Sequence, residues 1–162
     1  MQNFINNFFV KLFVVIAALA LPWVLLSVEG PLPSISTYWM SKMQPAFIFV
    51  NAAISYHLFN TRRWEIPSLF LLILTAFSIE MYPVIHNVSS VAFFATSAIP
   101  FFYAKRLQFY LKLYACSILF LFHSILAAEI IGISILCLYH AHVLIVYNCI
   151  KKKREKQNQN NL

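Results

Sequence analysis

Residues 130–150 read IIGISILCLYHAHVLIVYNCI, and the basic run KKKREK follows directly at 151–156. The first stretch contains no charged side chain, and a helix over it spans about 30 Å, the thickness of a bilayer's hydrocarbon core. An apolar helix that ends in a cluster of lysines is typical of a membrane span that ends at the cytoplasmic surface. The two segments together therefore predict an integral membrane protein whose C-terminus lies in the cytoplasm.

The composition of the whole chain agrees with this prediction. Of 162 residues, 61% are hydrophobic and only 10% are charged, and there are 2 glycines. A soluble domain carries about a quarter of charged residues. The backbone of a membrane span must satisfy its own hydrogen bonds, and the apolar stretches lack the two-residue alternation of barrel strands. These features exclude a water-soluble enzyme, a nucleic-acid-binding domain and a disordered chain, and they predict an all-α fold.

Charged residues divide the chain into six apolar stretches, so we expect a polytopic bundle of six transmembrane helices. The helices are predicted near 10–28, 44–60, 65–82, 88–104, 111–128 and 132–150. Pro83 is assigned to the turn after the third helix, because proline disfavours helix at the residue before it. Pro100 is expected to kink the fourth helix. Residues 1–150 then form one transmembrane domain, and residues 151–162 form a basic, polar tail.

The distribution of positive charge orients this bundle. With six spans, eleven of the 12 Lys and Arg residues fall on the side of the two termini, and only Lys42 falls on the other. Cytoplasmic loops carry the excess of Lys and Arg in membrane proteins. We therefore expect a multi-pass protein with both termini in the cytoplasm.

The tail and the cysteines carry less information. We read the tail as a cytoplasmic anchor with a disordered end, and a second reading is contact between its cations and anionic lipid headgroups. A nucleic-acid partner is not expected, because neither a folded reader nor an aromatic platform accompanies the basic run. The cysteines lie inside predicted helices without a C-x-x-C pair, and we expect them to be small buried hydrophobic residues: Cys116, Cys137 and Cys149.

Three acidic residues and one histidine are predicted to gather at the non-cytoplasmic end of the bundle. Glu29, Glu80 and Glu129 end the first, third and fifth predicted helices, and His86 lies in the turn between the third and fourth. An ionisable group beside a membrane span usually faces a polar interior or a water-filled cavity. We therefore expect these four residues to form one polar ligand-binding site, the alternative being that each acid is an ordinary solvated residue at the interface.

Two further histidines lie deeper in the predicted membrane region. His123 in the fifth helix and His140 in the sixth are expected at similar depth in an antiparallel hairpin. They are read as a structural pair, and the alternative is that they are two ligands of a zinc ion. No other cofactor and no catalytic residue is expected. His57 and Trp64 lie near the predicted inner boundary and are read as interfacial residues.

The segment after the first helix is too rich in proline to be helical. It reads EGPLPSIS at 29–36, and the amphiphilic residues Tyr38, Trp39 and Met40 that follow are expected to lie on the outer leaflet. Asn51 falls inside the second predicted helix, where its amide needs a hydrogen-bond partner.

Several of these positions resemble the pattern of one membrane-protein family. The positions are Pro33, Ser34, Ile35 and Ser36 after the first helix, Pro45 and Asn51 in the second, Pro83, His86 and Asn87 at the next outer turn, and Glu129. They resemble the DRAM/Frag/Sfk-type family, which includes the damage-regulated autophagy modulators and a Golgi protein of GPI-anchor lipid remodelling. The resemblance covers about residues 29–130. It implies six spans with cytoplasmic termini and a role in lipid handling.

Two classes of function follow from the residues and the resemblance. The first is a non-enzymatic membrane protein that handles or organises membrane lipids through the polar site at its non-cytoplasmic end. The second is an intramembrane zinc-dependent lipid amide hydrolase, in which histidines and a carboxylate hold the metal and activate water. The chain lacks the S-x-x-x-H and H-x-x-x-H spacings of alkaline ceramidases, so the first class is preferred.

Overall fold

The protein is an all-helical bundle in the computed structural model, which describes residues 8–104 and 107–160. The described residues contain no strand. Their helices are α2 (Phe8–Glu29), η1 (Ile35–Met40), α3 (Gln44–Phe59), α4 (Glu65–Ala76), α5 (Pro83–Ser97), α6 (Ile99–Tyr103), α7 (Gln108–Ser117), η3 (Ile118–Phe122) and α8 (Ile125–Asn160), where η marks a 3-10 helix. The predicted all-α class is therefore confirmed.

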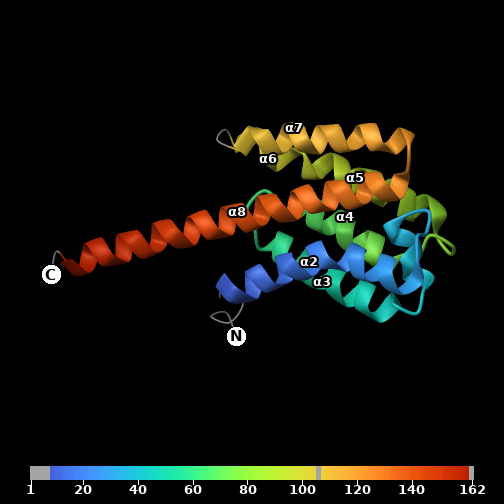
Figure 1. The fold of residues 1–162 in the computed structure, drawn as a ribbon, viewed down its shortest axis with the longest axis horizontal. Helices are drawn as coiled ribbons and strands as arrows, with labels where there is room; N and C mark the ends of the chain where they lie inside the picture. Colours follow the sequence, from blue (N-terminus) through green and yellow to red (C-terminus); the bar gives the residue numbers. More distant parts are fainter. Residues whose placement is uncertain (1–7, 105–106, 161–162) are drawn as a thin grey trace.

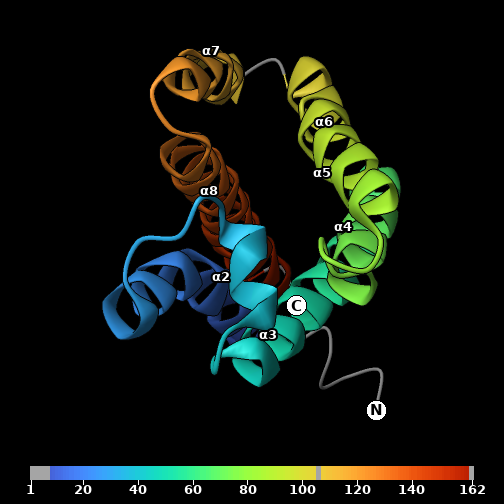
Figure 2. The same ribbon diagram turned by 90° about the vertical axis from the view of Figure 1, so that its right-hand side faces the viewer.

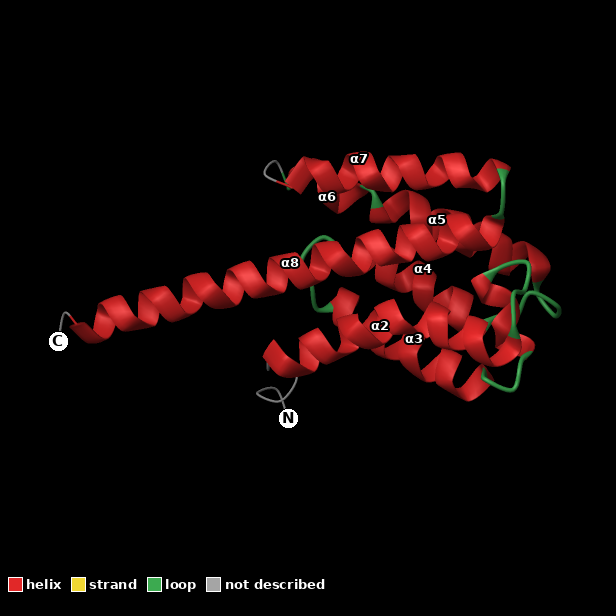
Figure 3. Cartoon of the chain, in the orientation of Figure 1, coloured by secondary structure: helices red, strands yellow, loops and turns green. Residues whose placement is uncertain are grey.

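The helices follow one another around a ring (Figures 1 and 2). Each of α2, α3, α4 and α5 packs against its successor, α6 continues α5 and contacts α7, and α8 contacts both α7 and α2. The last helix thereby closes the ring against the first. The loops gather at the two ends of the bundle, with the start of α2 and the end of α8 at the same end (Figure 3).

Three helical segments are long and apolar enough to cross a membrane. They are Phe8–Glu29, Pro83–Tyr103 and Ile125–Lys151, and shorter apolar helices cover Glu65–Ala76 and Gln108–Leu121. Many large apolar side chains lie on the outside of the bundle, including Phe13, Phe49 and Val91. An exposed apolar surface of this extent suits lipid better than water as the surrounding solvent.

Two predicted boundaries around the third and fourth helices are wrong. α4 ends at Ala76 rather than near residue 82, and α5 begins at Pro83 rather than near residue 88. Proline is well suited to the first turn of a helix, where its missing N–H has no partner to lose. Near Pro100, where a kink is predicted, the assigned helix is interrupted at Ala98 and resumes as α6.

The boundary between the last two helices also differs from the prediction. The helix expected over 111–128 ends at Phe122, and α8 begins at Ile125. Ser124 precedes α8, and its hydroxyl accepts a hydrogen bond from the Ala127 N–H at 3.3 Å. This side-chain cap explains why α8 starts here. Glu129 therefore lies near the start of α8 and does not close the preceding helix.

The tail is helical as far as residue 160, because α8 continues through it. The expected disordered end is therefore not found in this stretch. α8 is 36 residues long and extends through the basic run as far as Asn160. It projects well beyond the other helices (Figure 1). Two of the other basic residues used to orient the bundle, Lys105 and Arg106, lie outside the described residues.

An aromatic cluster fills the inner part of the ring. Phe101 is fully buried, and its ring centroid lies 4.7 Å from that of Tyr139, 5.6 Å from that of Tyr114 and 6.0 Å from that of Trp64. Trp64 is only 2% exposed. The Trp64 indole is therefore part of the core and packs between α6 and α8.

Candidate functional site

The four residues predicted to form one polar site lie at the same end of the bundle. Glu29 ends α2, Glu80 lies in the turn between α4 and α5, His86 lies in the first turn of α5, and Glu129 lies in the first turns of α8. These turns face the end opposite to the start of α2 (Figure 1). Within the described residues, however, neither a hydrogen bond nor an ion pair joins any two of the four.

Glu129 is buried and binds the backbone of a distant loop. Its side chain is 9% exposed, and Oε2 accepts a hydrogen bond from the Ile35 N–H at 2.6 Å. Ile35 is the first residue of η1, so the carboxylate satisfies one of the backbone donors that every helix leaves free at its start. Glu129 thereby ties η1 to α8.

His86 has a separate partner and lies in α5 rather than in the turn before it. It is 1% exposed, and Nδ1 donates a hydrogen bond to the Phe77 carbonyl at 2.7 Å. Since a carbonyl can only accept, the proton is on Nδ1. The contact joins the start of α5 to the end of α4.

The remaining two acids differ from each other. Glu80 is exposed in its turn, in agreement with the alternative that it is a solvated residue. Glu29 is partly buried, and its Oε1 atom lacks a hydrogen-bond partner.

The segment expected on the outer leaflet is instead inserted into the end of the bundle. Tyr38 is 1% exposed and donates a hydrogen bond to the Gly30 carbonyl at 2.6 Å. The Trp39 indole donates to the Thr75 carbonyl of α4 at 2.8 Å, and Ser34 and Ser36 share a buried hydroxyl hydrogen bond of 2.8 Å. We call residues 34–40 the outer plug. It packs against α3 and α8 and is hydrogen-bonded to α4, and only Met40 among the three expected surface residues is exposed.

Two adjoining cavities lie beneath the outer plug. The larger has a volume of about 70 Å³, is partly open to the outside, and is lined by side chains from α2, α3, α4, α5 and α8. The smaller, about 40 Å³, lies toward the plug and is bordered by Ser36, Ser90 and Glu129. Five residues line both cavities: Ile35, Asn51, Leu71, Phe93 and Ile133. We call the two together the interior cavity.

The larger part of the interior cavity is apolar apart from three side chains. These are Asn51, His57 and His140. Asn51 donates a hydrogen bond to the Phe47 carbonyl of its own helix at 3.0 Å, which is the partner that its amide requires. The two histidines lie at the inner part of the cavity, away from the plug.

His57 and His140 form a buried pair. They are 7% and 6% exposed, their ring centroids are 5.6 Å apart, and the His140 ring lies 4.3 Å from that of Trp64. The Nε2 atoms of both rings are buried and lack a hydrogen-bond partner. The interfacial reading of His57 is therefore wrong. Its position near the end of an apolar helix favours that reading, and the local sequence does not indicate that His140 of α8 packs against it.

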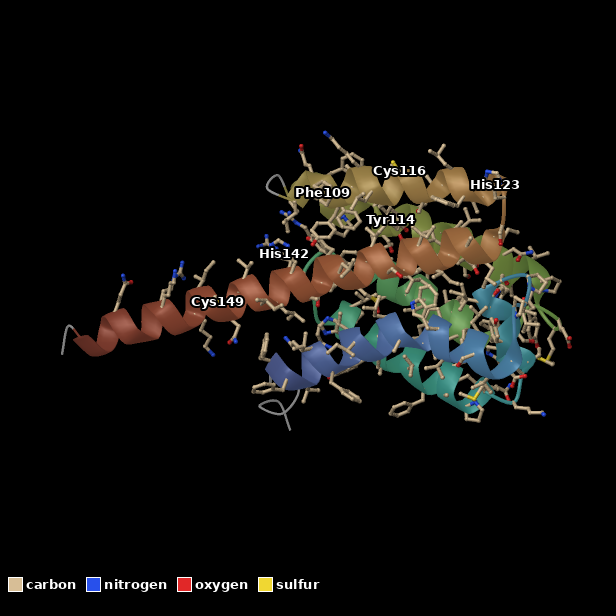
Figure 4. The ribbon with its side chains drawn as sticks, viewed as in Figure 1. Phe109, Tyr114, Cys116, His123, His142 and Cys149 are labelled. Atoms are coloured by element: carbon tan, nitrogen blue, oxygen red, sulfur yellow. The ribbon has the colours of Figure 1, made fainter. Side chains whose placement is uncertain are left out.

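The predicted pairing of His123 with His140 is wrong. His123 lies exposed in the turn between η3 and α8, at the outer end of the bundle (Figure 4). His140 lies about 22 Å further along the axis of α8. In the part of the chain that the structure describes, no three His, Cys, Asp or Glu side chains are grouped as metal ligands would be.

The three cysteines do not share one environment. Cys137 is buried in the wall of the interior cavity, as predicted. Cys116 and Cys149 are exposed on the outer faces of α7 and α8, contrary to the prediction (Figure 4). The residues around Cys116 and Cys149 are mostly apolar, so the sequence does not indicate which side of each helix faces the inside of the ring.

The fold shows the class of the protein, which is an all-helical bundle with three helices long and apolar enough to cross a membrane. Comparison with known proteins does not narrow this class, since no family model, curated protein or solved structure matches the chain.

Proposed function

We propose that the protein is a multi-pass membrane protein that handles or organises membrane lipids without catalysing a reaction, and that a short stretch of a lipid's hydrocarbon chain enters its interior cavity. The observation that carries the proposal is the cavity itself, whose walls are apolar except for Asn51, His57 and His140. An apolar cavity inside a bundle excludes water and favours a hydrocarbon occupant. The resemblance to DRAM/Frag/Sfk-type proteins independently favours lipid handling.

The proposal includes six spans with cytoplasmic termini. Six successive helical segments support it, since α5 with α6 and α7 with η3 each form one interrupted segment. The strong excess of Lys and Arg at the end where the termini lie supports the orientation. In this arrangement the basic end of α8 emerges into the cytoplasm, where its cations lie within reach of anionic lipid headgroups.

The polar outer residues have a supporting part in this proposal. Glu129 holds the outer plug over the cavity, and Ser36 and Ser90 border the end of the cavity closest to the plug.

Filling the cavity tests the proposal. Ile133 lines both parts of the cavity, so Ile133→Trp places an indole where the chain would lie. Leu138→Trp on the outer face of the same helix is the matched control, because Leu138 is 51% exposed. Each protein is extracted in lipid nanodiscs, exchanged into detergent and washed, and the retained lipid is measured by mass spectrometry against folded protein.

We expect the parent and Leu138→Trp to retain a lipid in a fixed ratio to protein, and Ile133→Trp to lose it. Gel filtration of each variant shows whether it is folded, and the smaller Ile133→Phe replaces Ile133→Trp if the latter aggregates. Equal retention by the parent and the cavity-filling variant contradicts the proposal.

A further inference from the structure

We propose that four side chains bind a monovalent cation of the size of Na⁺ in the smaller part of the interior cavity: Ser36, Asn51, Ser90 and Glu129. They come from η1, α3, α5 and α8, and all of them line this part of the cavity, which measures about 40 Å³. Each supplies an oxygen atom, the kind of ligand that hard cations prefer. This site is independent of the proposed lipid handling, because an ion is assigned to the part of the cavity closest to the outer plug.

The Glu129 carboxylate supplies the negative charge of this site. Its Oε2 atom accepts the Ile35 N–H at 2.6 Å, and the side chain is 9% exposed. Hydrogen bonds from a backbone N–H to a neutral oxygen are typically about 2.9–3.0 Å long, and those to an ionised oxygen are shorter. The short hydrogen bond therefore indicates that Glu129 is ionised in a place that little water reaches.

This buried charge has no cationic partner in the part of the chain that the structure describes. Among those residues, neither a lysine nor an arginine lines either part of the interior cavity. The hydrogen bond from Ile35 uses Oε2 of Glu129 and leaves Oε1 without a donor from the described residues. Buried charges in folded proteins are paired or coordinate metal ions. A cation in the adjoining cavity supplies the missing counter-charge.

Three neutral side chains offer further oxygen ligands. Asn51 is 9% exposed, and its amide donates through Nδ2 to the Phe47 carbonyl, which leaves Oδ1 available as a ligand. The buried Ser36 hydroxyl is hydrogen-bonded to that of Ser34, and a hydroxyl oxygen carries two lone pairs. The Ser90 hydroxyl makes no hydrogen bond within the described residues. One carboxylate and three neutral groups thus border the same small space.

The charge and the size of the site favour a small monovalent ion. Na⁺ neutralises one carboxylate, whereas Ca²⁺ leaves a net positive charge among apolar side chains, and an uncompensated buried charge is costly. Mg²⁺ dehydrates reluctantly and keeps several of its waters. The cavity of about 40 Å³ is close to the volume of one water molecule, about 30 Å³, so it suits a single small ion and excludes an organic cation.

A single ordered water is the competing occupant. Water forms hydrogen bonds with the same oxygen atoms and satisfies the neutral groups, but it leaves the Glu129 charge uncompensated. The two occupants therefore differ in a measurable respect, because only an ion site gives saturable sodium binding that depends on Glu129.

Binding of radioactive sodium to the purified full-length protein tests the inference. Scintillation proximity in detergent gives the affinity and the amount bound, and unlabelled NaCl, choline chloride and CaCl₂ serve as competitors at matched ionic strength. Because this competition uses the parent protein alone, it remains informative if a variant does not fold. We expect saturable binding of one Na⁺ per chain, and competition by NaCl at least about tenfold better than by the choline or calcium salt.

Variants then locate the ion. Glu129→Gln removes the charge and keeps nearly the same shape, and it should abolish sodium binding. Ser90→Ala removes one neutral ligand and should weaken binding by about tenfold, a loss comparable to that of a hydrogen bond to a charged group. Ser89→Ala is the matched control and should bind as the parent does, because Ser89 is the adjacent buried serine of α5 and does not line the cavity.

Thermal stability gives a second measurement. A ligand that binds only the folded state raises the melting temperature. Replacement of choline chloride by NaCl should therefore raise the melting temperature of the parent and of Ser89→Ala, and it should leave that of Glu129→Gln unchanged. An equal rise in the parent and in Glu129→Gln overturns the assignment of Glu129.

Each contrary outcome of the binding assay overturns the proposal in a distinct way. Failure of the parent to bind sodium saturably leaves water as the occupant. Equal competition by choline chloride overturns a specific ion site, and stronger competition by CaCl₂ overturns the monovalent ion. Unchanged binding in both Glu129→Gln and Ser90→Ala overturns the assigned ligands. Loss of lipid from Ile133→Trp is measured separately, so the proposed function can stand where the ion site fails.

Discussion

At the scale of single residues, Glu129 shows what sequence can and cannot reveal. The sequence predicts that it lies with Glu29, Glu80 and His86 at one end of the bundle, and the structure places it at that end, almost fully buried. Its partner, the Ile35 N–H, lies 94 residues away in the chain, in the proline-rich segment that follows the first helix. No local pattern encodes such a contact. For the same reason the partnership of His57 with His140 was missed.

Removal of the Glu129 side chain should destabilise the fold. Glu129→Ala leaves the Ile35 N–H without its acceptor, and a hydrogen bond to a charged group contributes about 1.5–3 kcal/mol. We therefore expect a clearly lower melting temperature in detergent, measured by fluorescence-detected gel filtration after heating. Glu80→Ala is the control, because Glu80 is exposed and a surface substitution changes stability by about 0.5 kcal/mol or less. Equal melting temperatures for the two variants would show that the Ile35 contact does not stabilise the protein.

At the scale of elements, apolar stretches predicted where helices lie better than where they end. α2 and α3 agree closely with the predicted 10–28 and 44–60. Near Pro83 and Ser124, residues that favour a helix start decided the boundary against the longer apolar pattern. In a membrane span every position is apolar, so hydrophobic periodicity marks neither the ends nor the inward face.

Close packing of α8 against its neighbours depends on Gly132. A Cβ atom at this position would lie 3.3 Å from the Phe94 ring and 3.6 Å from both Tyr114 and the Ser117 hydroxyl. An alanine requires only a small shift of the Phe94 ring, whereas a leucine does not fit. We expect Gly132→Ala to change stability by less than about 1 kcal/mol and Gly132→Leu to lower it by about 1–3 kcal/mol or more. The same heating assay checks this order, and a leucine variant as stable as the parent would show that the helices are less tightly packed.

At the scale of the whole molecule, composition predicted the helical class, and the described residues confirm it. The closure of the ring by α8 and the cavity inside it were not predictable, because they depend on which helices meet. The sequence pattern places the polar residues along each helix and does not specify their neighbours across the bundle. The pairing of His57 with His140 is therefore visible only in the structure. For the acids, the sequence predicts the end of the bundle at which they lie, but not their partners.

Accessibility of introduced cysteines tests the orientation of the bundle. In a background without Cys116, Cys137 and Cys149, we expect a membrane-impermeant maleimide added to intact cells to label Asn87→Cys and not Gln157→Cys. Both native side chains are exposed, so labelling reports the side of the membrane and not burial. Permeabilised cells supply the control in which both positions react. Labelling of position 157 from outside would overturn the proposed cytoplasmic C-terminus.

The outer plug has a kinetic consequence. It is fastened to α8 through Glu129 and to α4 through the Trp39–Thr75 hydrogen bond, so withdrawing it requires both attachments to break together. We therefore expect a molecule held beneath the plug to exchange slowly with the surrounding bilayer. The contents of a freshly purified sample would then record the membrane in which the chain was assembled, and the dissociation half-time, more than the equilibrium affinity, would determine what the protein carries.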